Sequence, residues 1–205
     1  MPDNTAPYNL ILQVAEIWVA PVGTAQPDVD DPTPDSPWAL LGNAGRLDYD
    51  TDGVHVIMEQ SIQGFMSSGS TMDRKVARVS ESIRATVKLA DMSLESLSHA
   101  LNENGITTVA AGSGTPGTKA INLYQGPDVA TFACCIRGFS PYSGDADSFM
   151  QVEMPNAYNA DGWDIAQQKG VAWAYTLNLR GLIDPNNPTS AARAGRIIAY
   201  SATPL

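Results

Sequence analysis

Apolar and polar residues alternate with a period of two along several stretches of the chain. The clearest alternation spans residues 171–182, where the odd positions from Val171 to Leu179 are apolar and the even positions are small or polar. Residues 76–90 show the same alternation, and only Glu81 interrupts their apolar face. Successive side chains of a strand point to opposite faces of a sheet, so both stretches are predicted to be half-buried strands.

Other stretches carry weaker strand signals. The apolar set of residues 8–19 switches from even to odd positions, which predicts a strand with a bulge near residues 15–16. Residues 47–51 and 54–58 are predicted to pair as a hairpin, because Asp52-Gly53 between them suits a two-residue turn with positive φ. Further strands are expected at residues 119–125, 129–139 and 148–158.

One segment, about residues 92–103, is predicted to be helical. Leu94, Leu97 and Leu101 recur at helical spacing, Ser93 can cap the start, and Asn104-Gly105 ends the pattern. His99 lies on the opposite face and is expected to be solvated. The predicted fold class is therefore mainly β: an antiparallel β-sandwich or barrel with one flanking α-helix and long loops.

Long polar segments connect these elements. Residues 21–37 are acidic and rich in proline, residues 61–75 are polar with two glycines, and residues 110–118 are rich in Gly, Ser and Thr. We interpret residues 1–205 as one domain with an N-terminal arm (1–8) and a C-terminal arm (184–205). Loops of a dozen or more residues are uncommon in a compact domain and are often functional, which favours surfaces that contact neighbouring subunits.

Composition restricts the classes of function. The net charge is −10, which disfavours a tight grip on nucleic acid, since phosphate would be repelled. The chain lacks a run of about 18 apolar residues and a signal-peptide pattern, so we expect no membrane span and synthesis in a cytoplasm. The adjacent Cys134 and Cys135 are expected on opposite faces of one strand, rather than in a disulfide or a metal site.

One motif has the spacing of a calcium-binding loop. Asp48, Asp50, Asp52, Gly53 and Glu59 occupy the fixed positions of an EF-hand loop. The flanking residues do not predict the two helices that an EF-hand requires. A solvated acidic turn is therefore the favoured interpretation, and a calcium site at Asp48, Asp50, Asp52 and Glu59 is the alternative.

No pattern of catalytic residues stands out. Gly112–Gly117 matches a dinucleotide fingerprint but does not open a helix, and Gly64–Thr71 has phosphate-loop spacing without the required lysine. The chain has two histidines and no nucleophile elbow. We expect no enzyme, no catalytic residue and no cofactor.

The region between Trp38 and Leu101 carries an ordered set of motifs. It runs Trp38-x-x-Leu41-Gly42, then Asp52-Gly53-Val54, then a long alternating strand from Arg78 to Leu89, and then Ala90-Asp91-x-Ser93-Leu94-Glu95-x-Leu97-x-x-Ala100-Leu101. This order resembles the major tail tube proteins of long-tailed, siphovirus-type bacteriophages. The resemblance covers about a third of the chain, and the acidic insert at residues 21–37, expected to decorate the outside, departs from the family pattern.

The resemblance implies a structural virion protein. Such subunits form hexameric rings that stack into the hollow tail tube through which phage DNA passes without specific binding. The implied partners are further copies of the chain and the tape-measure, tail tip and tail terminator proteins. The implied location is the phage tail, after assembly in the host bacterial cytoplasm.

The resemblance also suggests roles for particular residues. Residues 61–75 are expected to form an inter-ring loop, with contacts from Gly64, Phe65, Met66, Ser67, Ser68, Gly69 and Met72. Possible lumen-facing or charged residues are Asp48, Asp50, Glu59, Glu81 and Glu153. An acidic wall would let DNA slide, because like charges prevent a sticky contact.

Two alternatives remain open from the sequence. One is a β-sandwich binding module, which the acidic motif would make calcium-dependent. The other is a related assembly protein, such as a tail terminator or a type VI secretion tube protein.

Overall fold

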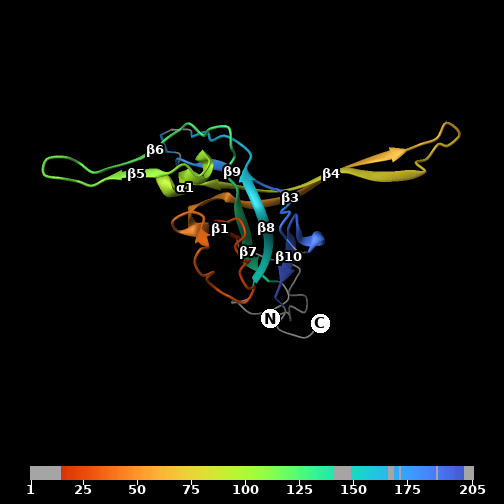
Figure 1. Cartoon of the computed structure of the whole chain (residues 1–205), viewed down its shortest axis with the longest axis horizontal. Coiled ribbons are helices and arrows are strands. Elements are labelled where there is room, and N and C mark those ends of the chain that lie inside the picture. Colours follow the sequence, from red (N-terminus) through yellow and green to blue (C-terminus); the bar gives the residue numbers. More distant parts are fainter. Residues whose placement is uncertain (1–14, 141–148, 166–168, 171, 188, 201–205) are drawn as a thin grey trace.

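The computed structural model describes residues 15–140, 149–165, 169–170, 172–187 and 189–200. It is mainly β, with antiparallel sheets and one short helix, which confirms the predicted fold class (Figure 1). The predicted N-terminal arm (1–8) and residues 8–14 of the strand expected at 8–19 lie outside these residues.

One antiparallel sheet forms most of the body. Its strands run in the order β2-β1-β7-β8-β9-β4-β3, and β10 also pairs with β8. The strands are β1 (Glu16–Pro21), β2 (Ala39–Leu40), β3 (Tyr49–Phe65), β4 (Lys75–Leu89), β7 (Phe132–Phe139), β8 (Phe149–Asn159), β9 (Tyr175–Gly181) and β10 (Arg196–Ala199). A second, two-stranded sheet consists of β5 (Ile106–Val109) and β6 (Thr118–Ile121).

The main sheet curls so far that strands from its two ends meet. The Tyr49 hydroxyl of β3 accepts a hydrogen bond from the Ile17 backbone N–H of β1 at 3.1 Å and donates to the Leu41 carbonyl at 2.9 Å. Burial raises the pKa of Tyr49, so this hydroxyl keeps its proton and its donor role. The predicted sandwich or barrel is therefore one sheet rolled towards closure.

The inside of this roll is the hydrophobic core. It combines inward-facing residues from opposite parts of the sheet with the buried face of the helix, which is why the sheet curls around it. The largest fully buried apolar side chains are Tyr175, Ile17, Leu41, Leu89, Leu101, Met154, Leu177 and Leu179. Full burial of one such aliphatic side chain contributes roughly 1.5–3 kcal/mol.

A smaller core lies on the other face of β1 and β7. It contains Trp18, Ala20, Trp38, Ala133 and Cys135, whereas the adjacent Cys134 lies in the main core. The prediction that the two cysteines lie on opposite faces of one strand is thus confirmed.

The acidic segment 21–37 packs against the body near this smaller core. Its backbone carbonyls accept hydrogen bonds from body side chains, at 2.8 Å from Arg137 and from Gln151 and at 3.0 Å from Trp38. Arg137 and Gln151 are almost fully buried. Apart from Pro21, which ends β1, the segment lacks strands, as predicted; it is anchored to the body although most of its residues are exposed, and its place on the outside of an assembly stays a prediction.

The helical segment is shorter than the predicted 92–103. It consists of α1 (Leu94–Ser98) and the 3₁₀ turn η2 (His99–Leu101). The Ser93 hydroxyl caps the start by accepting a hydrogen bond from the Ser96 N–H at 3.3 Å. Asn102 has a positive φ of 59° and ends the segment earlier than Asn104-Gly105 predicts. Two further 3₁₀ turns are η1 (Gly45–Asp48) and η3 (Ser190–Ala192).

Two sequence predictions about connections are wrong. The expected hairpin at Asp52-Gly53 is one continuous strand, β3, whose pairing with β4 shifts register between Tyr49 and Val54. Gly53 has a positive φ of 69°, as the predicted turn would require, but it lies at an irregularity within the strand. The C-terminal arm is also not free up to residue 200, because β10 pairs with β8 and the Glu153 carboxylate holds Arg196.

Two hairpins leave the body on opposite sides (Figure 1). The longer one is formed by β3 and β4, and the shorter one by β5 and β6 with the intervening residues 110–117. The predicted loop at residues 110–118 is thus the tip of a hairpin, and the strand expected at 119–125 begins and ends earlier.

Candidate functional site

The outer part of the β3–β4 hairpin, residues 58–81, is the most distinctive surface of the molecule. We call it the arm. Strand pairing continues from Met58 opposite Ile83 to Phe65 opposite Lys75, so the arm is a two-stranded ribbon rather than a loop. The prediction of a loop over residues 61–75 therefore needs correction: only residues 66–74 connect the strands.

The connecting residues form a tight, locally hydrogen-bonded tip. The Arg74 N–H donates to the Phe65 carbonyl at 2.8 Å, and the Ser70 N–H donates to the Ser67 carbonyl at 2.9 Å. Of the expected inter-ring residues, Gly64 and Phe65 end β3, whereas Met66, Ser67, Ser68, Gly69 and Met72 lie in the connection. The structure thus brings all seven together at the far end of one ribbon.

Large apolar side chains of the arm are exposed to solvent. They are Met58 at 62%, Ile62 at 55%, Phe65 at 65%, Met66 at 54%, Met72 at 77%, Val76 at 62% and Val79 at 62%. Soluble monomers seldom expose a large contiguous apolar patch, so such a surface marks an interaction site. The arm has no core of its own, because a lone two-stranded ribbon cannot bury both of its faces.

An apolar groove lies where the arm leaves the body. The core-facing side of β3 and β4 buries Val87 and Ala85, and then continues outward to Ile83, which the core covers only in part, and to Met58, which is 62% exposed. Together with residues from β8, β10 and the segment after β9, it encloses about 490 Å³. The main apolar lining residues are Val56, Met58, Ile83, Val152, Ile183 and Ile197.

Sequence reasoning did not find this groove. Ile197 belongs to the segment interpreted as a C-terminal arm (184–205) and Ile183 directly precedes that segment, yet both line a folded wall, where they are 68% and 69% exposed. The short apolar run Ile197-Ile198-Ala199 after Arg196 was the available signal for a strand.

The four residues of the calcium motif do not converge. The Asp48 carboxylate accepts a hydrogen bond from the Ala44 N–H, Asp50 pairs with Lys88, and Glu59 pairs with Arg84 at 2.7 Å. The Lys88 ammonium lowers the pKa of Asp50 by hydrogen bonding to its charged form. Among the described residues no group of three or more His, Cys, Asp or Glu side chains could hold a metal ion. The alternative calcium site is therefore not formed.

The possible lumen residues occupy different environments. Glu59 and Glu81 are exposed on the arm, where Arg84 and Arg78 neutralise them. Glu153 is only 3% exposed and binds Arg196 in the body, with an N–O distance of 2.5 Å. Glu153 therefore does not face solvent in the single chain, which disfavours a position on the wall of a lumen.

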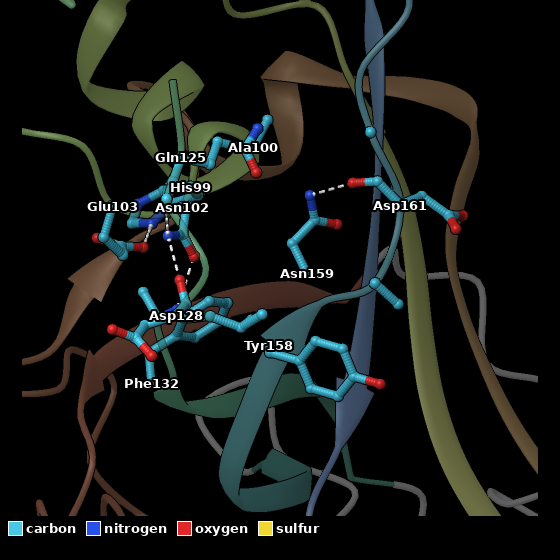
Figure 2. Close-up of a pocket in the computed structure, with 15 residues that line it drawn as sticks. His99, Ala100, Asn102, Glu103, Gln125, Asp128, Phe132, Tyr158, Asn159 and Asp161 are labelled. Atoms are coloured by element: carbon cyan, nitrogen blue, oxygen red, sulfur yellow. Dashed lines mark hydrogen bonds and ion pairs between the residues drawn. The ribbon is translucent and has the colours of Figure 1, made fainter. Parts of the chain in front are cut away.

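A second cavity, of about 270 Å³, lies between the helical segment and the end of β8 (Figure 2). The Asn102 side chain positions the segment around residues 125–128 on one side of the cavity, because its amide donates to the Gln125 and Asp128 carbonyls at 2.9 and 2.8 Å. His99, expected to be solvated, is only 19% exposed and contacts Glu103 at 2.5 Å. Its ring lies near Phe132, with centroids 6.0 Å apart.

Several polar side chains of this second cavity already have partners, among them His99 with Glu103 and Asp161 with Asn178. Its lining includes no Ser, Thr, Cys or Lys that could act as a nucleophile, and the Asn102 and Asn159 amides already hold backbone carbonyls. We take the arm and the groove as the candidate functional site, because large apolar side chains are exposed there.

Within the described residues, the structure contains no helix long and apolar enough to cross a membrane. A comparison with protein-family models gave no match, and a comparison with curated proteins found no similar sequence.

Proposed function

We propose that the chain is a structural subunit that self-assembles into stacked hexameric rings, and that these rings form the hollow tail tube of a long-tailed bacteriophage. The observation that carries the proposal is the arm: a paired ribbon that exposes apolar side chains on both of its strands and extends beyond the core of the body. Burying this surface requires another molecule.

The exposed edge of the main sheet also supports self-assembly. β3 has 17 residues and is the last strand of the sheet order, so one side of it has no neighbouring strand among the described residues. Exposed edges of this length promote pairing with another chain, and natural proteins usually shorten or cover them. A ring of subunits would cover this edge on every copy.

The remaining parts of the proposal follow from the family resemblance. The tape-measure, tail tip and tail terminator proteins would be partners, and DNA would pass through the lumen without specific contacts. The net charge of −10 agrees with a conduit that does not retain DNA. The virion would be the location of the assembled protein.

Negative-stain electron microscopy of the purified chain at high concentration, with and without seeding by tail-tip complexes, tests the proposal. The matched variant replaces residues 62–79 with Asn-Gly, because the Ser61–Ser80 pair then closes a two-residue turn and keeps the register of the body. We expect hollow tubes or stacked rings from the full chain and only compact particles from the variant.

The length of the assemblies separates the related alternatives. Single rings that never stack would indicate a tail terminator rather than a tube. Compact monomers under every condition, including seeding, would contradict the proposal.

A further inference from the structure

We infer that the apolar groove at the root of the arm receives the tip of the arm of a second copy of the chain. This inference rests on the proposed self-assembly and names the contact that drives it. The tip is the set Phe65, Met66 and Met72, and the groove is the one lined by Met58, Ile183 and Ile197.

The groove is built for apolar side chains. Val152 forms part of its lining, and the Arg196 side chain beside it is held by the buried Glu153 carboxylate, so it needs no further partner. Its volume of about 490 Å³ lies within the range of roughly 300–1,000 Å³ found for pockets that enclose a ligand. An aromatic side chain such as Phe65 brings a large apolar area to such a site, about 150–250 Å².

The tip cannot reach the groove of its own chain. Phe65 lies seven residues beyond Met58, which corresponds to about 23 Å along an extended strand. Cross-strand pairs continue on both sides of a register shift between Ser61 and Ile62, and the ribbon extends away from the body (Figure 1). The tip that fills a groove must therefore come from another copy.

Charges at the two surfaces are complementary. Asp73, Arg74 and Lys75 follow Met72 and give this part of the tip one net positive charge, whereas Glu81 lies at the rim of the groove beside Ser82. Glu81 has one exposed partner, Arg78, at 2.9 Å, and exposed ion pairs of this kind are weak and easily exchanged. A second copy therefore offers both the apolar side chains and the cations that this groove accommodates.

The tip and the groove are different surfaces, so each contact joins unlike patches of two copies. In a stacked assembly each copy would place its tip in one neighbour and receive the tip of another, so the contact would repeat from copy to copy. The two surfaces can therefore be tested separately. A chain with a damaged tip still has an intact groove, and a chain with a damaged groove still has an intact tip.

The test uses two variants that block opposite halves of the contact. The tip variant carries Phe65→Ser and Met66→Ser, and the groove variant carries Ile183→Lys and Ile197→Lys. All four positions are more than half exposed, so we expect little loss of folding stability. Leu47→Lys, at an 82% exposed position on the body, controls for the introduced charge.

Mass photometry or analytical ultracentrifugation measures the outcome. We expect each variant alone to stay monomeric, and an equimolar mixture to form a 1:1 dimer that does not grow further. Continued assembly of either variant alone, or a mixture that stays monomeric while the wild type assembles, would overturn the inference.

Crosslinking gives a second measurement with milder substitutions. Phe65→Cys in one chain and Ile197→Cys in another should be joined by a short bis-maleimide only when the two are mixed. Cys134 and Cys135 do not interfere, because both are fully buried and burial raises the pKa of both thiols, that of Cys135 to about 12. Two monomeric Cys chains that remain unlinked at concentrations where the wild type assembles would contradict the contact.

These outcomes separate the inference from the proposed function. Tubes from the groove variant would leave the tail tube proposal standing and remove the groove as the acceptor. A 1:1 dimer from the mixture, without tubes from the wild type, would support the contact between tip and groove and contradict the tail tube proposal. If truncation before residue 15 is needed to make Ile197→Cys reactive towards maleimide in the monomer, the chain's own N-terminal residues occupy the groove and the inference is wrong.

Discussion

The two halves of strand β4 have the same sequence pattern and opposite environments. Val87 near the body is 1% exposed and lies in the main core, whereas Val79 on the arm is 62% exposed. Both belong to the same alternating series of apolar residues, and both strand segments are paired with β3. The difference teaches that alternation identifies a strand with an apolar face, while the rest of the molecule decides whether anything covers that face.

The arm is therefore a part of the sheet that extends past its own core. In the body, β9 pairs with β4 from Arg84 to Leu89, and the helical segment adds to the same core. Beyond Arg84 this neighbour is absent, and only the β3 partner remains. The stability of the folded chain should then depend on the body half, and association on the arm half.

The largest difference is expected from one substitution made in both halves. Val87→Ala should lower the free energy of unfolding by about 2 kcal/mol, because it removes buried methyl groups and leaves a cavity. Val79→Ala, at an exposed site on the same strand, should change it by less than about 0.5 kcal/mol. Urea unfolding followed by circular dichroism measures both, and equal effects would show that the arm is covered in the single chain.

A smaller effect is expected where β3 begins. Tyr49→Phe removes the hydroxyl that joins Ile17 and Leu41, so a buried N–H and a buried carbonyl each lose a partner. We expect a loss of about 1.5 kcal/mol in the free energy of unfolding. Tyr124→Phe, at an 84% exposed position, is the matched control and should have no measurable effect. If Tyr49→Phe also had none, the contact between the ends of the sheet would not close the roll.

The smallest effect concerns acid stability near the body end of the hairpin. Partial burial alone would raise the pKa of Asp91, but hydrogen bonds from Ser96, Ser93 and Asn43 outweigh it and the pKa is lowered. A carboxylate with a lowered pKa in the folded state stabilises fully above its unfolded value, about 3.9, and this contribution is lost as the pH falls through the folded pKa.

Asp91→Asn should therefore be less stable than the wild type at neutral pH, and the two stabilities should converge below about pH 4. Urea midpoints at pH 7, 5, 4 and 3 test this expectation. Asp73→Asn, in the exposed tip of the arm, is the control for the loss of one negative charge at an exposed position. A curve for Asp91→Asn that runs parallel to that of the wild type would contradict a role of the charged carboxylate.

Much of the fold could be predicted from the sequence, because the strands carry their pattern locally. The alternation of residues 76–90 gave β4 almost to the residue, and the Leu94–Leu97–Leu101 spacing gave the helical segment. The prediction of a hairpin turn at Asp52-Gly53 was wrong for a physical reason. A positive φ at Gly53 suits a turn and a strand irregularity equally well, and only the pairing partner decides between them.

The candidate site could be predicted only in part. The apolar residues at the tip were visible, since Phe65, Met66 and Met72 stand out in a polar segment. The groove could not be predicted, because Met58, Ile183 and Ile197 come from three distant parts of the chain and meet only through the sheet order. The burial of Glu153 was also hidden, since its partner Arg196 lies 43 residues away.

The separation between tip and groove has a consequence for growth. An assembly that repeats this contact is polar: one terminus presents unoccupied tips and the other presents unoccupied grooves. The two termini then differ in chemistry, so that subunits add to them at different rates and each needs its own kind of cap. A capping protein that mimics the apolar tip would stop one terminus, and one that mimics the groove would stop the other.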